Sequence, residues 1–458
     1  MSASLVGSEM CIRDRSTTMH FMPGCEILQS FDLVHWEHAT YVYETLDHTD
    51  AQQLKSGQNI YGQGMWAASL RYHEGRFYIC FVANDTRKTY LYTSEKIDGP
   101  WKKQLIEGFY HDGSLLFDED GRNYIVYGND EIWITELNED LTAPKKDGLH
   151  RLLVSDHKNP ELGYEGSHIQ KINGYYYIFL IHSLRDRWMR TEACFYSDSL
   201  EGEFTGGDVL CDDRGYCGQG VAQGGIVDTP DGKWYAMLFQ DSGAVGRIPI
   251  LLPVTWKDHF PFFGQNGHVP EEIEVHSTRP GYIYQPLVGS DDFCNGLLPR
   301  WQFNHDPDPR YYHLDALQGT YTITTREVCT ELTQAVNTLT QRMSYPSCAA
   351  EVTVDASALK EGDVAGLCAL QSCYAAVGIT KHHGKYEVLM LDKKEDGILD
   401  MTEGTVVESH QMDFRLEADF CNMKDEARCY YRVNKGDWLH IGLSLIHISE
   451  PTRLALIS

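Results

Sequence analysis

Positive charge is scarce in this 458-residue sequence, in which 39 lysine and arginine residues stand against 66 aspartate and glutamate residues and give a formal net charge of −27. Such a protein repels the phosphates of nucleic acids and anionic membranes, so we expect neither as a partner. No apolar run reaches the roughly 18 to 20 residues of a membrane span, and no signal-peptide pattern opens the chain. The 13 cysteines form no CxxC pair, which is typical of reduced thiols and predicts a cytoplasmic location.

The two ends lack the strand and turn pattern of the rest. Residues 1–15 (MSASLVGSEMCIRDR) and 444–458 (SLIHISEPTRLALIS) resemble translated sequencing-adaptor sequence, and we set both apart as non-native segments. On this interpretation the natural protein starts upstream of Ser16 and continues past Gly442, so the chain is a fragment. The alternative is a genuine flexible start and tail.

Amphipathic helices with a 3.6-residue period are also missing, and alternating strands broken by turns predict an all-β protein. One unit recurs, consisting of a strand, a turn and an aromatic-rich strand, with turn glycines at Gly75, Gly121, Gly174 and Gly232, about 50 residues apart. A second hairpin unit follows at 94–101 and 197–204. Two hairpins per repeat predict the four-stranded blades of a β-propeller. SFDLVHW, at 30–36, matches the second unit with no first unit before it, which indicates a truncated first blade.

A different pattern begins near Asp291, where short alternating strands follow one another without a blade motif. It predicts a β-sandwich of jelly-roll type. We therefore expect a propeller over residues 16–287 and a truncated sandwich over 288–443, connected through residues 278–290.

Two acidic residues stand directly before apolar strands of successive blades. Asp112 lies in FYHDGSLLF and Glu165 in GYEGSHIQKI. A propeller channel gathers the inner strand of every blade, so these carboxyl groups are expected to converge and to serve acid/base chemistry. The alternative for each is a turn acid that caps backbone amides.

The blade motifs resemble glycoside hydrolase family 43, of the β-xylosidase and α-L-arabinofuranosidase type, over residues 16–285. The residues that carry the resemblance are MWAASLRYHEGRFY, HDGSLLFDEDGRNYIVYG, YEGSHIQKINGYYYIF and AQGGIVDTPDGKWYAMLFQDSGAVGRIPILLPVTW. Residues 289–442 look like the concanavalin A-like sandwich often appended to these enzymes. The resemblance implies five blades and inverting hydrolysis of O-glycosidic bonds in xylose- or arabinose-containing plant polysaccharides, such as xylan, arabinoxylan or arabinan.

By position in these motifs, the resemblance makes Glu165 the general acid that protonates the leaving oxygen. It makes Asp112 the carboxyl group that orients the acid and keeps its proton affinity high. The family's general base, an aspartate at the start of the first blade, has no counterpart in this sequence, so the fragment is expected to bind sugar better than it cleaves it. Asp32, in SFDLVHW, is a poor substitute because its counterpart in the repeat is an outer-strand turn position.

The same resemblance suggests residues that bind substrate. Arg247 matches an arginine that holds sugar hydroxyls, with a structural salt bridge as the alternative. Trp66 matches an aromatic wall of the pocket, with a core tryptophan as the alternative. His168 and His111 are candidate pocket hydrogen-bond donors, with a structural role as the alternative.

Two positions depart from the family pattern. Gln223, which is also a candidate substrate-binding residue, takes the place of a histidine near the channel, beside which many members hold a calcium ion. Met19 falls where many have an aromatic residue. No cofactor is required on this interpretation and no metal takes part in catalysis; calcium is compatible with the channel as a structural ion.

Two other functional classes compete with the glycosidase hypothesis. One is a non-catalytic carbohydrate-binding protein, against which the presence of both Asp112 and Glu165 argues. The other is a protein-interaction propeller, which predicts WD-type signatures that the sequence lacks.

Overall fold

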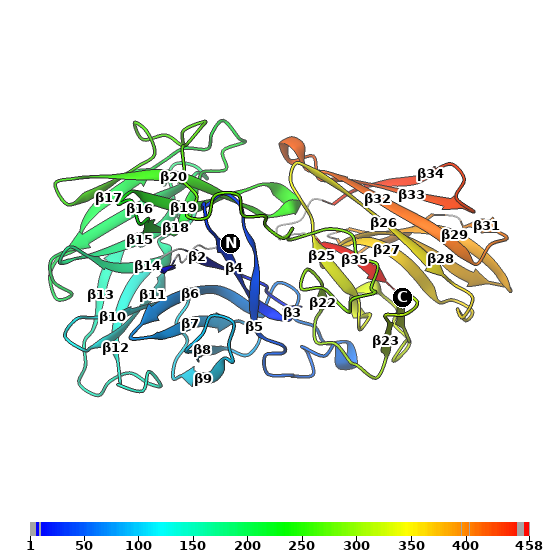
Figure 1. Cartoon of the computed structure of the whole chain (residues 1–458), viewed down its shortest axis with the longest axis horizontal. Coiled ribbons are helices and arrows are strands. Elements are labelled where there is room, and N and C mark those ends of the chain that lie inside the picture. The colour runs from blue at the N-terminus through cyan, green and yellow to red at the C-terminus, as the bar shows by residue number, and fades with distance from the viewer. Residues whose placement is uncertain (1–5, 9–10, 395, 403, 447–452, 458) are drawn as a thin grey trace.

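The computed structural model describes residues 6–8, 11–394, 396–402, 404–446 and 453–457. Over these residues nearly all regular secondary structure is β-strand, and the chain forms two bodies side by side, a propeller and a sandwich (Figure 1). The described part has no helix long and apolar enough to cross a membrane. Four short 3-10 turns complete its regular structure: η1 (Lys55–Gly57), η2 (Gly243–Val245), η3 (Leu332–Gln334) and η4 (Cys421–Met423).

Five four-stranded antiparallel sheets make up the propeller, which confirms the predicted fold class. The first two sheets consist of β1 (Val6–Ser8), β2 (Cys11–Ser16), β4 (Gly24–Ser30) and β5 (Glu37–Tyr43), then β6 (Met65–His73), β7 (Arg76–Ala83), β8 (Lys88–Ser94) and β9 (Lys102–Ile106). The third and fourth consist of β10 (Ser114–Phe117), β11 (Asn123–Asn129), β12 (Glu131–Leu137) and β13 (His150–Ser155), then β14 (Glu165–Ile172), β15 (Tyr175–Ser183), β16 (Arg190–Ser197) and β17 (Thr205–Leu210). The fifth consists of β18 (Ala222–Asp228), β19 (Trp234–Asp241), β20 (Arg247–Lys257) and β21 (Phe260–Phe263).

The repeated glycines form the first hairpin turn of blades two to five. Gly75, Gly121, Gly174 and Gly232 all have φ between 77° and 84°, a left-handed conformation that suits glycine, and a Cβ there would have open space. Glycine is therefore favoured at these turns by the backbone conformation and not by a lack of space for a side chain. The second repeated unit joins the third and fourth strands of a blade, as β8 to β9 and β16 to β17 show.

The first blade contains residues that the sequence analysis set apart. Residues 6–8 and 11–16 form β1 and β2, and β2 pairs antiparallel with β4 from Ile12 opposite Ser30 to Ser16 opposite Glu26. Strand β1 has only three residues and contacts both β6 and β18, so it lies where the ring of blades closes. The first blade thus has four strands, with a short first one. The non-native origin of these residues stays a prediction, and residues 1–5 and 9–10 lie outside the described part.

The sandwich stacks a nine-stranded sheet on a four-stranded sheet. The larger sheet contains β3 (Phe21–Met22), β22 (Gln302–Asn304), β25 (Leu339–Arg342), β35 (Arg453–Ile457), β27 (Val364–Leu370), β28 (Tyr374–His382), β29 (Lys385–Lys393), β30 (Leu399–Met401) and β31 (Thr405–Val407). The smaller contains β26 (Ser347–Asp355), β32 (Gln411–Asp419), β33 (Glu426–Val433) and β34 (Leu439–Leu445), and a separate hairpin consists of β23 (Tyr312–Asp315) and β24 (Thr320–Ile323). Strand β35 belongs to the second segment that we set apart, and it pairs with β25 and β27.

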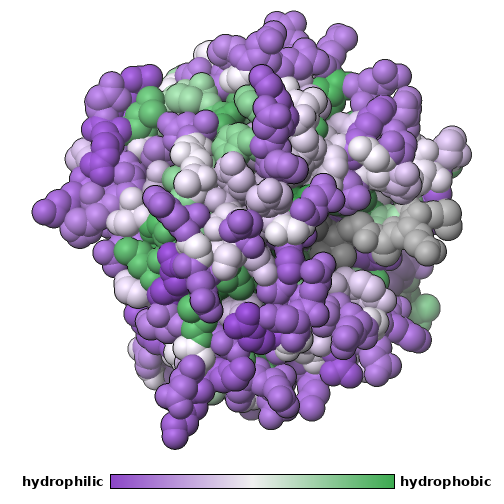
Figure 2. All heavy atoms as spheres, turned by 90° about the vertical axis from the view of Figure 1, so that its left-hand side faces the viewer, coloured by the Kyte–Doolittle hydropathy of each residue, from purple (hydrophilic) through white to green (hydrophobic). Residues whose placement is uncertain are grey.

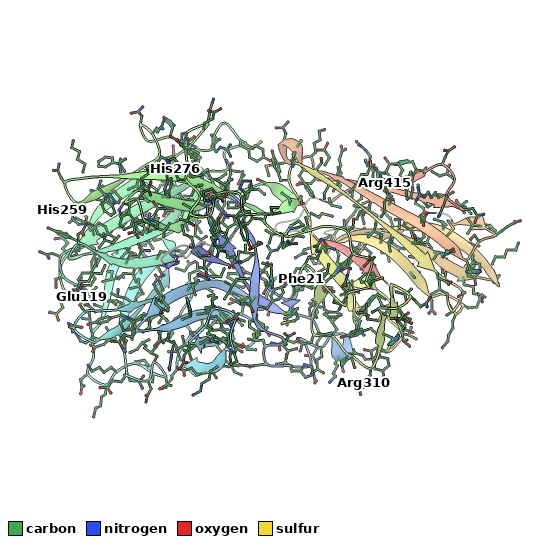
Figure 3. All side chains as sticks on the ribbon, in the orientation of Figure 1. Phe21, Glu119, His259, His276, Arg310 and Arg415 are labelled. Carbon is green, nitrogen blue, oxygen red and sulfur yellow. The ribbon has the colours of Figure 1, made fainter. Side chains whose placement is uncertain are left out.

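The two domains share structure. Strand β3 comes from the propeller part of the sequence but pairs with β22 of the sandwich, and Phe21 lies at the junction (Figure 3). Ala244 and Val245 of the propeller belong to the core cluster between the sandwich sheets. The predicted boundary at 287/288 falls in the long segment between β21 and β22, and its exact position stays a prediction.

The hydrophilic surface and the free thiols agree with the high charge and the cysteine spacing of the sequence. The outer face of the propeller is mostly hydrophilic, with hydrophobic residues in small scattered groups (Figure 2). All 13 cysteines are free. A cytoplasmic location stays a prediction.

Candidate active site

Irregular pairing at the inner strands positions the candidate site. The register between the first two strands of a blade shifts between Met65 and Ala68, between Glu165 and His168, and between Ala222 and Gly225. A β-bulge of this kind turns side chains away from the regular alternation. Trp66, Gly166 and Gln223 occupy these equivalent positions in three blades, so bulges repeat where predicted site residues lie.

Asp112 is anchored by a backbone N–H and a side-chain hydroxyl of the next blade. Its Oδ2 accepts a hydrogen bond from the N–H of Gly166 at 3.1 Å, and the Ser167 hydroxyl donates to its carbonyl oxygen at 2.8 Å. The residue has φ 47°, a left-handed conformation that costs energy for a non-glycine residue and occurs preferentially at functional sites. The side chain is 7% exposed. These contacts hold one carboxyl oxygen in a fixed direction.

Glu165 begins β14 and is the more accessible of the two acids, with 21% of its side chain exposed. The Asn129 amide, at the end of β11, donates a hydrogen bond to its Oε2 at 2.7 Å. The structure therefore brings both predicted carboxyl groups together, Asp112 from the strand entry of one blade and Glu165 from that of the next.

His111 lies between the two acids. Its Nε2 is 3.8 Å from Asp112 Oδ2 and 3.8 Å from Glu165 Oε2, and its ring packs against Trp66 with centroids 5.8 Å apart. Burial lowers the pKa of His111, but the polar contact with Glu165 and the charges of Asp112 and Glu165 outweigh it, so the pKa is raised overall.

The pKa of the Asp112 carboxyl is raised, first by burial and further by the charge of Glu165. His111, Arg247 and the Gly166 hydrogen bond oppose this shift. Asp112 is therefore a group whose proton affinity depends on its neighbours, as expected of a residue that modulates a nearby acid.

Two arginines flank the carboxyl groups. Arg247, the first residue of β20, is 41% exposed, and its guanidinium lies 4.3 Å above the Phe239 ring and 3.6 Å from Asp241. Arg190 forms an ion pair with the same aspartate and is buried enough to lower its pKa, although Asp241 and Glu165 counteract this. The predicted alternative for Arg247, a structural salt bridge, is present only as this long contact.

Trp66 and Gln223 line the bulges rather than the open surface. The indole N–H of Trp66 is buried and has no hydrogen-bond partner among the described residues. Gln223 is 3% exposed, and its backbone N–H donates to Glu192 Oε2 at 2.7 Å. Its side chain would collide with a Cβ at Gly166, 2.6 Å from Nε2, so the glycine lets the two blades approach.

His168 lies deeper than the pocket acids. It is 4% exposed, and burial, together with the charges of Arg15 and Arg71, lowers its pKa well below the usual value. Arg15 is itself fully buried, and none of its guanidinium nitrogens has a partner among the described residues. His168 is buried and its lowered pKa favours the neutral form, and its role in substrate binding stays a prediction.

The remaining two positions, Asp32 and Met19, lie outside the cluster of site carboxyl groups. Asp32 accepts backbone N–H bonds from Val34 and His35, as an ordinary turn acid does, and borders a different cavity of about 500 Å³ between the first and fifth blades. It is not grouped with the site carboxyl groups. Met19 forms an isolated bridge with Met65, next to Trp66.

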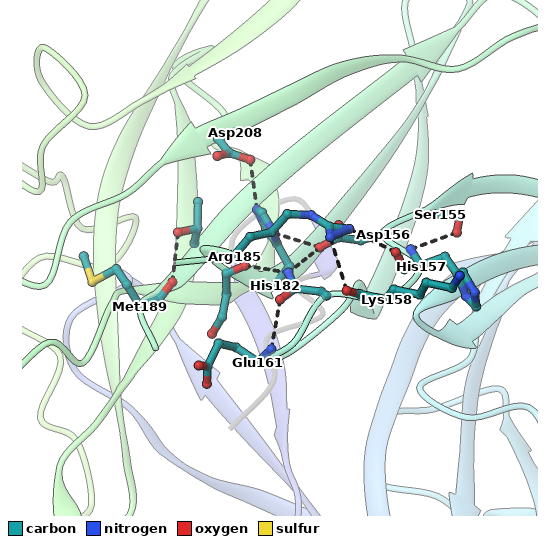
Figure 4. Close-up of polar contacts among 12 residues, drawn as sticks. Ser155, Asp156, His157, Lys158, Glu161, His182, Arg185, Met189 and Asp208 are labelled. Atoms are coloured by element: carbon teal, nitrogen blue, oxygen red, sulfur yellow. Dashed lines mark hydrogen bonds and ion pairs between the residues drawn. The ribbon is translucent and has the colours of Figure 1, made fainter. Parts of the chain in front are cut away.

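A polar network supports the segment that leads to Glu165 (Figure 4). His182 bridges Asp156 at 3.3 Å and Asp208 at 2.9 Å, and Arg185 donates to Asp156 at 2.8 Å. The His182 ring meets Tyr164 edge-on at 5.0 Å, directly before Glu165. Burial lowers the pKa of His182, but the two aspartates raise it overall, which favours the charged, bridging form.

Sequence reasoning missed Asn129, Arg190, Asp241 and Glu192. Each lies at the end of a strand or in a strand interior without a distinctive local motif. Only the arrangement of blades brings Asn129 of β11 to Glu165 of β14 and Arg190 of β16 to Asp241 of β19.

The short distance between the Asp112 and Glu165 carboxyl groups limits the catalytic roles that the pair can have. The ligand atoms of His111, Asp112 and Glu165 all lie within 4.8 Å of one another. Acid and base of an inverting glycosidase stand roughly 6.5 to 9.5 Å apart, because a water molecule must fit between base and sugar. Asp112 is thus too close to Glu165 to be that base, and fits the role of a modulator.

A propeller with a buried carboxyl group beside a more exposed one, flanked by arginines and aromatic rings, defines a carbohydrate-active protein. The family model "Glycosyl hydrolases family 43" matches residues 13–261, and "Beta xylosidase C-terminal Concanavalin A-like domain" matches residues 290–452. The chain belongs to glycoside hydrolase family 43, an inverting family, and is a glycosidase with a concanavalin A-like sandwich.

Individual relatives cover most of the chain. A beta-xylosidase from Formosa agariphila is 26% identical over 82% of this chain and 72% of its own length, and a non-reducing end alpha-L-arabinofuranosidase from Bacteroides ovatus is 23% identical over 84% and 75%. The solved structure of a bifunctional family 43 protein from Bacteroides eggerthii is 39% identical, with a TM-score of 0.91 over 99% of this chain. The chain spans 59% of the length of that protein.

Proposed function

We propose that this chain acts on the glycosidic bonds of xylose- or arabinose-containing plant polysaccharides or oligosaccharides, with Glu165 as the general acid. The observation that carries the proposal is the pairing of a partly exposed Glu165, held by Asn129, with a buried Asp112 held by Gly166. The beta-xylosidase and alpha-L-arabinofuranosidase relatives support this substrate class.

In this mechanism Glu165 gives a proton to the oxygen of the leaving sugar as the bond breaks. Asn129 fixes one carboxyl oxygen by donating to it, so the other is presented to the substrate. Asp112 and Glu165 carry like charges when both are ionised, and this repulsion favours a proton on the pair.

The sequence offers no residue for the general base that activates water. Among the described residues, His111, Asp112 and Glu165 form a cluster whose ligand atoms all lie within 4.8 Å of one another. This cluster contains no third carboxyl group that could act as the base. The absence of a general base stays a prediction, and it implies a chain that binds sugar better than it cleaves it.

Sugar recognition falls to the groups around the acids. Arg247 and Arg190 offer N–H donors to hydroxyl groups, and the rings of Trp66 and His111, which are tilted against each other, offer aromatic contact surface. A neutral sugar suits a protein of net charge −27, since no electrostatic attraction is needed.

We propose that hydrolysis needs no cofactor, because proton transfer between carboxyl groups, water and sugar completes the reaction. A structural calcium ion remains a proposal for the channel near Gln223. The Gln223 side-chain amide and the Glu192 carboxyl group, which accepts from the Gln223 N–H, are candidate oxygen donors there, and calcium would need further oxygen ligands to reach six to eight.

The test compares turnover with binding. Hydrolysis of 4-nitrophenyl β-D-xylopyranoside and 4-nitrophenyl α-L-arabinofuranoside is measured with and without sodium azide. Azide is a nucleophile that needs no base, so it can replace the water that a general base would activate. We expect azide to raise the rate, and the better substrate to identify the sugar. Xylobiose binding is measured in parallel by calorimetry.

The carbohydrate-binding alternative gives a different result. It predicts xylobiose binding with no turnover of either substrate, with or without azide, and no effect of Glu165→Gln on affinity. That outcome would replace the glycosidase mechanism for this chain.

A further inference from the structure

We propose that His111, Asp112 and Glu165 form a binding site for a divalent cation of the zinc type, and that this cation blocks the sugar pocket. The inference goes beyond the proposed function in its binding step, and rests on that function only where competition with sugar is concerned.

The three side chains already surround a small common volume. His111 Nε2 is 3.8 Å from Asp112 Oδ2 and from Glu165 Oε2, and all three ligand atoms lie within 4.8 Å of one another. Zinc takes nitrogen and oxygen ligands at about 2.0 to 2.2 Å, so tetrahedral neighbours stand roughly 3.4 Å apart. Movements of about 1 Å would close the site.

The donor set selects the metal. One imidazole nitrogen with two carboxylate oxygens suits zinc and neighbouring first-row metals, whereas calcium and magnesium prefer oxygen donors alone. Three protein ligands leave a fourth position for water, as in open zinc sites. The cluster reaches solvent through Glu165 and His111, each with 21% of its side chain exposed.

Surrounding groups orient the ligands. Asn129 donates to Glu165 Oε2 and the Gly166 N–H to Asp112 Oδ2, while the Trp66 ring packs on His111. Such outer contacts hold ligands in place and strengthen metal binding. Oxygen atoms of carboxylates have two lone pairs, so each can keep its hydrogen bond and still accept the metal.

Positive charge nearby limits the affinity. Arg190 and Arg247 act on Glu165 and Asp112, and Arg87 acts on His111. Asp241 pairs with Arg190 and lies near Arg247, which offsets part of their charge. The two ligand carboxylates face a divalent cation at much shorter range than these guanidinium groups.

An occupied site excludes catalysis. The cation would hold both carboxyl groups that the sugar reaction needs, and Glu165 could not carry its proton. Zinc should therefore inhibit competitively with sugar, whereas calcium at the same concentration should not.

The experiment is a calorimetric titration of zinc chloride, and separately calcium chloride, into the metal-free protein near neutral pH. Four exposed cysteines could bind zinc by themselves, so they are first blocked with N-ethylmaleimide: Cys211, Cys217, Cys294 and Cys329. Cobalt chloride gives a second readout, because its visible absorption reports nitrogen and oxygen ligation. Melting curves confirm that each variant is folded.

We expect one zinc ion per chain, bound at least tenfold more tightly than calcium. His111→Gln and Asp112→Asn should each weaken zinc at least tenfold and remove the cobalt spectrum. His259→Gln, which changes a histidine that packs against Tyr175 outside the site, should leave both unchanged.

Equal affinity for zinc and calcium, or zinc binding that survives His111→Gln in folded protein, overturns the proposal. These outcomes do not depend on sugar cleavage. Zinc binding without loss of turnover would overturn the blocking step alone, and absent turnover with intact zinc binding would count against the proposed function instead.

Discussion

Asp112 and Glu165 lie close together but in different surroundings. Asp112 is nearly buried and takes a backbone N–H, whereas Glu165 faces the opening and takes a side-chain amide. Pairs of acids whose environments differ in this way divide the roles of modulator and acid. These surroundings therefore support Glu165 as the acid that contacts the substrate and Asp112 as the group that acts through Glu165.

Asn129→Ala should lower kcat more than it changes KM. The substitution removes the 2.7 Å hydrogen bond to Glu165 Oε2, so the acid loses its fixed orientation while the sugar wall remains. A loss of about ten- to a hundredfold in kcat is expected for an acid out of position. Steady-state kinetics on an aryl glycoside checks this, with Asn123→Ala at the opposite end of β11 as control.

The stability of the Glu192→Gln variant relative to the parent chain should increase as pH rises. Burial raises the pKa of Glu192 well above its usual value of 4.5, so the folded protein keeps the proton while the unfolded chain ionises. Stability from this group is full below pH 4.5 and is lost at higher pH, by up to about 1.4 kcal/mol per pH unit. Glutamine, which does not ionise, avoids that loss.

Melting temperatures at pH 5 and pH 8 provide the measurement. The advantage of Glu192→Gln should be larger at pH 8, and the exposed Glu201→Gln should show no such trend. An advantage that is the same at both pH values would mean that Glu192 is ionised in the folded protein.

The inner strands of the blades form the functional element. Bulges in β6, β14 and β18 place Trp66, Gly166 and Gln223 at equivalent positions, and close approach between Gly166 and Gln223 brings β14 against β18. The site thus depends on how neighbouring blades contact each other as well as on the individual acids.

Gly166→Ala should destabilise the protein by more than 2 kcal/mol. Its φ of 66° already costs a side chain about 1 to 2 kcal/mol, and the new Cβ would meet Gln223 at 2.6 Å. Gly174→Ala is the matched control, because its φ of 84° carries the same conformational cost in open space. Urea denaturation compares them; equal losses would show that Gln223 moves aside freely.

The sequence predicted the hairpins well, since turn glycines and alternating strands are local signals. It also predicted Asp112 and Glu165, which stand beside those signals. The bulges, Asn129 and Arg190 could not be predicted, because they depend on contacts between blades. Strands β1, β2 and β35 were not expected either, since residues 6–8, 11–16 and 453–457 lack strand patterning. Their pairing comes from the strands beside them, β4 for β2, and β25 and β27 for β35.

At the scale of the whole molecule, propeller and sandwich are joined by strand pairing and by buried polar contacts. Arg342 of the sandwich donates to Ser16 and pairs with Glu26 of the first blade at 2.6 Å. The Tyr61 hydroxyl donates to the Thr333 carbonyl oxygen at 2.9 Å. Such contacts make the sandwich part of the support for the propeller.

Arg342→Ala should therefore lower the free energy of unfolding by about 1 to 3 kcal/mol, because Glu26, with a side chain only 6% exposed, loses a charged partner. Arg310→Ala removes an arginine that is 74% exposed and pairs locally with Asp308, so its effect should stay below about 0.5 kcal/mol. Urea denaturation of both variants provides the comparison. Equal midpoints would mean that the domain contact adds nothing to stability.

The most direct test of the account is whether Glu165 gives its proton to the leaving group. Hydrolysis of 4-nitrophenyl and unsubstituted phenyl β-D-xylopyranoside is measured for the parent chain and Glu165→Gln, with azide present. A poor leaving group needs protonation and a good one does not, so the variant should lose about 10² to 10⁴ in rate on the phenyl substrate and at least tenfold less on the nitrophenyl one. An equal loss on both substrates, or none on either, would contradict the role of Glu165 as the general acid.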